Sequence, residues 1–278
     1  MLITDTLDSV RKRAMALGRC APAVFYVLIV VSWFADGVRA GAYSRLWLMA
    51  LTLPALGLYL WRTDREKTMS PNFTALLLTS IAFGATVLGF MAWRFGSANM
   101  MVFVVMAGLF PAVMDFLSSF VARNYEYPGQ SRLWVFSYIF FGWIGVCGTC
   151  MLLAEGILAR PSEDLLSQPR LLWQVPVAAG IIAVCLDLFI DPVAVVAGYW
   201  VWLVPGEVYF GIPLLNFVGW FVLMFLAPLA WILIARKPAW GYWCKVGTAI
   251  GALVPLFVAA IGLSLVLNRG FSQPHNSC

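Results

Sequence analysis

The sequence predicts an all-α, polytopic integral membrane protein, a helix bundle with about seven to eight transmembrane helices. Three observations support this fold class. The chain of 278 residues is 62% hydrophobic and only 11% charged, whereas a soluble domain carries about 25% charged residues. Apolar runs of about 20 residues, long enough to cross the hydrocarbon core of a bilayer, recur along nearly the whole length. The polar stretches between them are too short for a soluble domain, so we expect 1–278 to form a single integral membrane domain.

The predicted spans follow one another along the chain and are separated by polar linkers. They are expected near 21–38, 45–61, 72–93, 99–121, 133–158, 171–191, 212–235 and 246–266. The linkers are charged and contain proline, as in RTDREKTMSPN at 62–72 and ARPSEDLLSQPR at 159–170. Lys and Arg are shared too evenly between the two sides to fix the orientation. The expected location is the cell membrane.

The segment after the sixth span is the least regular part of this pattern. Pro192 disfavours helical geometry in the residue before it, which is Asp191. The residues that follow contain Gly198 and end in Pro205-Gly206, which makes a poor full span. We expect the helix to break at Pro192 and a re-entrant or cavity-lining segment to follow, since irregular backbone at membrane depth must line protein or water.

Two stretches of the chain resemble each other. MDFLSS at 114–119 is similar to LDLFID at 186–191. Each is followed by a pair of aromatic residues, by Pro-Gly and, at equal spacing from that Pro-Gly, by Gly-Trp: Tyr125, Tyr127, Gly142 and Trp143 in one copy, and Trp200, Trp202, Gly219 and Trp220 in the other. We expect an internal repeat with halves of about 99–158 and 171–235. Repeats in membrane proteins place the functional site at their interface.

Two carboxyl groups at membrane depth are the strongest functional signal. Asp187 and Asp191 are four residues apart, so on a helix they share one face. A charged carboxylate in the bilayer costs several kcal/mol, and burial together with a second nearby carboxylate favours the protonated form. A neutral carboxylic acid in an apolar pocket is a good proton donor. Asp115, at the corresponding place in the first copy, is the third candidate catalytic residue.

Aromatic residues around these acids are candidates for binding a cation and an extended apolar substrate. An aromatic face stabilises a desolvated cation by about 2 kcal/mol. The candidate substrate-binding residues are Tyr199, Trp200, Trp202, Tyr209, Asn216, Trp220, Tyr127 and Trp143. Two alternatives remain open: Asp191 lies at a helix end among lipid headgroups, or the aromatic residues form an interfacial belt.

Metal, redox and nucleic-acid chemistry find little support. The chain has one histidine, which excludes the histidine-rich di-iron membrane enzymes. Cys147 and Cys150 form a C-x-x-C inside an apolar run and without a second pair, so helix packing is a simpler interpretation than a zinc or redox site. No run of basic and aromatic residues indicates a nucleic-acid surface. We expect no metal and no cofactor.

The second copy carries a family resemblance. LDLFIDPVAVVAGYWVW at 186–202, followed by YFGIPLLNFVGW at 209–220, resembles the membrane-bound carotenoid-biosynthesis family that includes the carotenoid 1,2-hydratases of the bisanhydrobacterioruberin and γ-carotene hydratase type. The matching residues are Asp187, Asp191, Pro192, Trp200, Trp202, Tyr209, Gly211, Pro213, Asn216, Gly219 and Trp220. Residues 1–98 carry no motif of this family. Asp115 and Tyr125-Glu126-Tyr127 stand where the family has a Glu and a Gly-rich, Tyr-x-Tyr region.

The resemblance implies hydration of a terminal double bond of an acyclic carotenoid without a cofactor. In this interpretation Asp187 donates the proton, Asp191 or Asn216 holds the attacking water, and tryptophans contact the cation and the polyene. The partners are then the lipophilic substrate and membrane lipids; the oligomeric state is not predicted. The alternatives are a proton-initiated terpene or meroterpenoid cyclase, a prenyltransferase that binds Mg²⁺ and diphosphate, and a proton-coupled transporter or carotenoid-binding scaffold.

Overall fold

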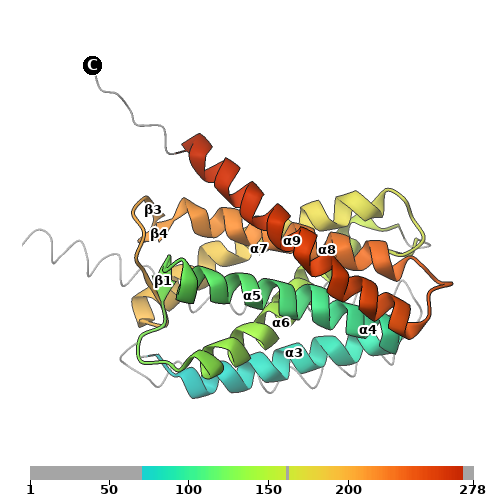
Figure 1. Cartoon of the computed structure of the whole chain (residues 1–278), viewed down its shortest axis with the longest axis horizontal. Coiled ribbons are helices and arrows are strands. Elements are labelled where there is room, and N and C mark those ends of the chain that lie inside the picture. Colours follow the sequence, from blue (N-terminus) through green and yellow to red (C-terminus); the bar gives the residue numbers. More distant parts are fainter. Residues whose placement is uncertain (1–70, 161–162, 272–278) are drawn as a thin grey trace, which may run out of the picture.

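The computed structural model describes residues 71–160 and 163–271, and this part of the chain is mostly helical (Figure 1). Six helical segments in it are long and apolar enough to cross a membrane: Phe73–Phe95, Ser97–Val121, Arg132–Leu158, Leu171–Ala197, Leu214–Ala235 and Tyr242–Val266. They confirm the predicted spans between 72 and 266, with boundaries that differ by a few residues. The predicted spans 21–38 and 45–61 lie outside the described residues, so the total of seven to eight stays a prediction.

The first described helix, α3 (Phe73–Phe95), begins and ends at residues suited to those positions. The Asn72 side chain accepts a hydrogen bond from the backbone N–H of Ala75 at 2.9 Å, which satisfies one of the donors that a helix start leaves unpaired. The helix ends at Gly96, whose φ of 84° favours glycine. The chain then turns directly into the next span.

The second described span is an irregular helix. It consists of α4 (Ser97–Phe103), the π-helical η1 (Val104–Leu109), α5 (Phe110–Phe116) and the π-helical η2 (Leu117–Val121). Pro111 lacks a backbone N–H, and the wider turns of η1 directly precede the segment that contains it. Segments of π-helix occur frequently at functional sites. Asp115 lies in α5, between the two π-helical segments.

Helix α6 (Arg132–Leu158) packs closely against α3. The contact is close because α6 has glycines where α3 presents large side chains. A Cβ at Gly145 would collide with the ring of Phe83, and one at Gly148 would collide with Val87. Small residues that bring backbones together are the usual means of packing helices in a membrane. Cys147 and Cys150 are buried free thiols on the same helix.

The prediction of a break at Pro192 is wrong. Helix α7 (Leu171–Ala197) continues through Pro192 and ends at Gly198, which has the left-handed φ of 77°. A proline inside a helix removes one backbone donor, and membrane helices tolerate this loss when neighbouring groups compensate. Pro192 is buried, and α7 packs along most of α8 (Leu214–Ala235). The irregular segment between α7 and α8 therefore begins at Gly198 and not at Pro192.

Short strands occupy the place of that segment. Strand β2 (Val201–Trp202) pairs antiparallel with β1 (Tyr125–Glu126), which follows η2, and β3 (Glu207–Tyr209) pairs with β4 (Ile212–Pro213). These strands lie together at one end of the bundle, the left end in Figure 1. The last helix, α9 (Tyr242–Phe271), starts at the opposite end and packs on α8.

The predicted repeat stays a prediction, but its two halves meet. In the β1–β2 pair Tyr125 lies opposite Trp202 and Glu126 opposite Val201. The rings of Trp143 and Trp220, which follow corresponding glycines, are 4.8 Å apart.

Candidate active site

The two acids of the second copy share one hydrogen-bond donor. Asp187 and Asp191 lie one turn apart on α7, and both side chains are buried, with exposed fractions of 0% and 2%. Asn216, in the first turn of α8, donates through Nδ2 to Asp187 Oδ2 at 2.5 Å and to Asp191 Oδ2 at 2.6 Å. The continuous helix places both acids on the face that α8 covers, and the amide joins them into one site.

The remaining contacts of the pair leave one oxygen unused. The two carboxyl groups lie within hydrogen-bonding reach of each other, and the side chain of Trp200 interacts with Asp191. Asp187 Oδ1 is buried and has no hydrogen-bond partner among the described residues. Because a buried carboxyl oxygen without a partner is unfavourable, such an atom is a place where a substrate or a water can bind.

The third predicted acid, Asp115, is held by three donors. Its Oδ1 accepts hydrogen bonds from the hydroxyl groups of Tyr125 at 2.7 Å and Tyr127 at 3.0 Å. Its Oδ2 accepts one from the indole N–H of Trp143 at 3.3 Å. An indole can only donate, so this oxygen acts as an acceptor. We call these four residues the Asp115 cluster.

The two tyrosines of the Asp115 cluster remain protonated. Burial, and then the nearby Asp115 carboxylate, raise the pKa of Tyr125 and of Tyr127 well above the usual value of a phenol. Both hydroxyl groups can therefore donate to Asp115 at any pH at which the protein works. Neutral donors that surround a carboxylate stabilise its negative charge.

The Asp115 cluster and the Asp187–Asp191 pair belong to one region. Asp115 is close enough to Asp191 for an electrostatic interaction between the two side chains. The Trp143–Trp220 ring contact joins the cluster to α8, one turn after Asn216. Two further ring contacts cross between the copies, Tyr125 to Trp202 at 4.7 Å and Tyr127 to Trp200 at 6.2 Å.

Two of the predicted substrate-binding residues, Tyr199 and Tyr209, contact residues outside the acid pair and the Asp115 cluster. The Tyr199 hydroxyl accepts a hydrogen bond from the backbone N–H of Asn72, and its ring packs on Phe73 at the start of α3. Tyr209 in β3 packs against Phe210 and Phe217. Their contacts in the structure are those of residues that hold the loop segments in place.

Sequence reasoning named Tyr127 but passed over two tyrosines beside it. Tyr125 makes the shortest hydrogen bond to Asp115; its signal was the Tyr-x-Tyr spacing, which puts both side chains on one side of an extended segment. The ring of Tyr138 on α6 lies 5.8 Å from that of Tyr127, and its buried hydroxyl has no partner among the described residues. No local pattern marks Tyr138, because its role depends on how α6 packs.

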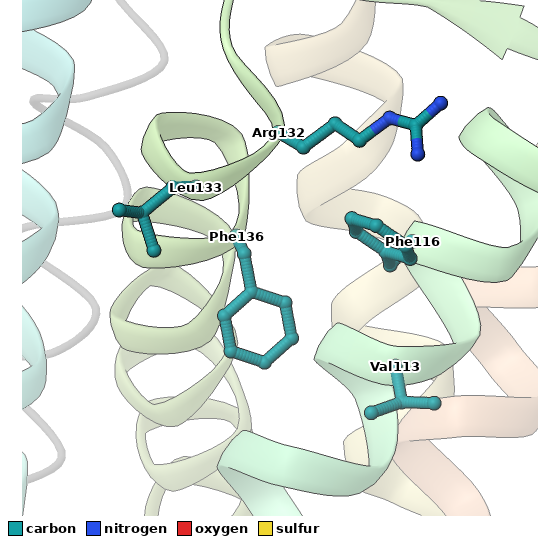
Figure 2. Close-up of a pocket in the computed structure, with 5 residues that line it drawn as sticks. All are labelled: Val113, Phe116, Arg132, Leu133 and Phe136. Atoms are coloured by element: carbon teal, nitrogen blue, oxygen red, sulfur yellow. The ribbon is translucent and has the colours of Figure 1, made fainter.

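An apolar recess of about 320 Å³ lies between α5 and α6. Figure 2 shows Val113 and Phe116 on α5, Phe136 on the facing side of α6, and Arg132 extending from the start of α6 to the side where Phe116 lies; Leu133 also lines the recess. Among the described residues, no three His, Cys, Asp or Glu side chains gather as a metal site. The chemical groups at hand are carboxyls, phenols, indoles and one amide.

A comparison with known protein families identifies the family of this chain. The sequence model of the family described as carotenoid biosynthesis protein matches residues 72–274. The chain belongs to the carotenoid biosynthesis protein family. The match includes all six described spans and every candidate site residue, and it confirms the resemblance seen in the sequence. Searches of curated proteins and of solved structures gave no match.

Membership fixes the broad role of this integral membrane protein. It acts in carotenoid biosynthesis, a pathway whose intermediates are long apolar polyenes, and the family suggests an enzyme. The buried acids and the aromatic rings around them are consistent with a substrate that is itself apolar.

Proposed function

We propose that this protein is a carotenoid hydratase that adds water to the terminal double bond of an acyclic carotenoid end. The observation that carries the proposal is the buried Asp187–Asp191 pair, bridged by Asn216, with one oxygen of Asp187 left without a partner. Two carboxyl groups that share one site and one donor hold a single proton between them more easily than two negative charges. A proton held in this way is available to an alkene.

The reaction balances with these groups alone. Asp187 gives its proton to the less substituted carbon of the double bond, and a tertiary carbocation forms on the other carbon. The oxygen of a water molecule attacks that carbon, and Asp191 accepts the proton that the water loses. Transfer of this proton from Asp191 to Asp187, whose carboxyl groups are within hydrogen-bonding reach, restores the starting state. The net change is the addition of one water.

The aromatic residues and Asp115 are suited to stabilising the carbocation intermediate. Trp143 donates to Asp115, Trp220 lies one turn after Asn216, and their rings are 4.8 Å apart; aromatic faces attract desolvated cations. Asp115, whose oxygens are held by three neutral donors, is a carboxyl group in a fixed orientation in the same region. Groups already oriented toward developing charge stabilise a transition state without reorganisation. We therefore assign Asp115 as the counter-ion of the carbocation.

The substrate and its location follow from the same chemistry. An acyclic carotenoid dissolves in the bilayer, so the enzyme meets it in the cell membrane. Trp200 and Trp202 then contact the polyene close to the reacting end, while Tyr199 and Tyr209 hold the loop segments that carry them.

The test is product formation in membranes supplied with an acyclic carotenoid, at matched protein levels. Wild type should yield a product heavier than the substrate by one water. Asp187→Asn should reduce product below detection because it removes the transferable proton, whereas Asp191→Asn should slow turnover by about 10²–10⁴-fold, the usual worth of general-base help. Asp164→Asn, at an exposed aspartate between α6 and α7, is the matched control and should remain active.

Other outcomes point to the alternatives. A product of unchanged mass would identify a proton-initiated cyclase, in which another alkene captures the cation. Substrate accumulation coupled to protons, without any product, would identify a transporter or scaffold. Equal activity of Asp187→Asn and wild type would contradict the proposed role of the pair.

A further inference from the structure

The recess between α5 and α6 combines apolar walls with a cation at its edge. Its walls are apolar, formed by Val113, Phe116, Leu133 and Phe136 (Figure 2). Its mouth carries the guanidinium group of Arg132. The volume of about 320 Å³ lies at the lower end of the range for ligand pockets, about 300–1,000 Å³.

Arg132 is held in position with its hydrogen-bond donors available. Its guanidinium carbon lies over the Phe120 ring, 5.4 Å from the ring centre, which is a cation–π contact. The five N–H donors point outward in the guanidinium plane. Among the described residues, Arg132 forms no ion pair, and its side chain donates no hydrogen bond. Planar donors of this kind match the oxygens of a phosphate group and can bind two at once.

The position of the recess indicates which kind of phosphate-containing molecule would bind there. Arg132 is the first residue of the α6 span, and arginines at span ends reach toward the headgroup layer. An apolar recess directly below this layer faces acyl chains. The ligand that satisfies both features carries a phosphate with net negative charge and a hydrocarbon chain.

We propose that this recess is a binding site for an anionic phospholipid, whose phosphate binds Arg132 and whose acyl chain lies against the apolar side chains of Val113, Phe116 and Phe136. The site is separate from the acid pair and does not depend on the reaction proposed above. Because Phe116 directly follows Asp115 on α5, the bound lipid packs against the helix that positions the Asp115 cluster.

Native mass spectrometry of the full-length protein tests this site. Detergent-solubilised protein is titrated with phosphatidylglycerol or with phosphatidylcholine of the same chains. The wild type should retain phosphatidylglycerol about tenfold more strongly, a difference of about 1.4 kcal/mol, because its headgroup has a net negative charge whereas the choline ammonium offsets the phosphate charge in phosphatidylcholine. Arg132→Gln should bring the ratio of the two lipids close to one. Arg123→Gln, at an exposed arginine that does not line the recess, should keep the wild-type ratio.

A second variant distinguishes binding in the recess from attraction to the charge of Arg132 alone. Val113→Phe places a larger side chain in the recess and leaves Arg132 in place, so phosphatidylglycerol retention should fall. Excess inorganic phosphate should not displace the lipid. The proposal is overturned if the two lipids bind wild type equally, if Arg123→Gln loses the preference as fully as Arg132→Gln, if Val113→Phe has no effect, or if inorganic phosphate displaces the lipid.

Discussion

Replacing Asn216 by leucine tests whether the shared amide matters for turnover. Leucine is similar in size but cannot donate, so Asn216→Leu removes the hydrogen bonds of 2.5 Å to Asp187 and 2.6 Å to Asp191. In the proposed reaction, both carboxylates of the pair are charged once Asp187 has given up its proton, and these bonds stabilise the added negative charge. One hydrogen bond to a charged group contributes about 1.5–3 kcal/mol. If the equivalent of one such bond is lost in the transition state, turnover should fall by about 10–10²-fold.

The assay is product formation per folded protein in membranes, with thermal unfolding measured on the same preparations. Asn124→Leu is the matched control, because Asn124 lies at the same end of the bundle and donates to Ser118 instead of to the acids. This control should retain near-normal turnover. If Asn216→Leu folds as well as wild type and keeps its full rate, the amide does not stabilise the reacting pair, which refutes the proposed role of Asn216.

Two further predictions concern metal dependence and helix packing. Excess EDTA should leave turnover unchanged, because the proposed reaction needs only a proton, an apolar site and one water; loss of activity restored by Mg²⁺ would instead indicate diphosphate chemistry. Gly145→Ala should lower the unfolding midpoint, since its Cβ would collide with Phe83 and overpacking costs about 1–3 kcal/mol. Gly251→Ala on α9, where a Cβ meets nothing within 4 Å, should not lower the midpoint, and equal losses in both variants would contradict the proposed contact.

The spans and the acid pair could be predicted because both depend on local periodicity. Apolar length alone locates helices such as α3 and α8 to within a few residues. The four-residue interval between Asp187 and Asp191 places them on one helical face wherever that helix packs. The alternation in Tyr125-Glu126-Tyr127 similarly determines that both tyrosines point the same way, although their common partner Asp115 was not foreseen.

The incorrect and missing predictions concern features that depend on how distant segments of the chain pack together. Pro192 indicates a break when only its neighbours in sequence are considered, but α7 is held against α8 along its length and remains helical. Tyr199 lies near the acids in sequence, yet the start of α3 supplies its partner, Asn72. The donors to Asp115 come from a strand, a loop and α6. A single sequence does not state which of these segments will meet.

The continuity of α7 limits which parts of the site can vary to change substrate choice. Because an unbroken helix rises 1.5 Å per residue, the backbone itself fixes the two acids about 6 Å apart along the axis. Substitutions elsewhere can alter what faces the pair but cannot change that interval. If the proposed function holds, differences in accepted chain length or end group within the family should therefore arise from the walls opposite α7, in α8 and in the β1–β2 ribbon, while the spacing of the acid pair stays constant.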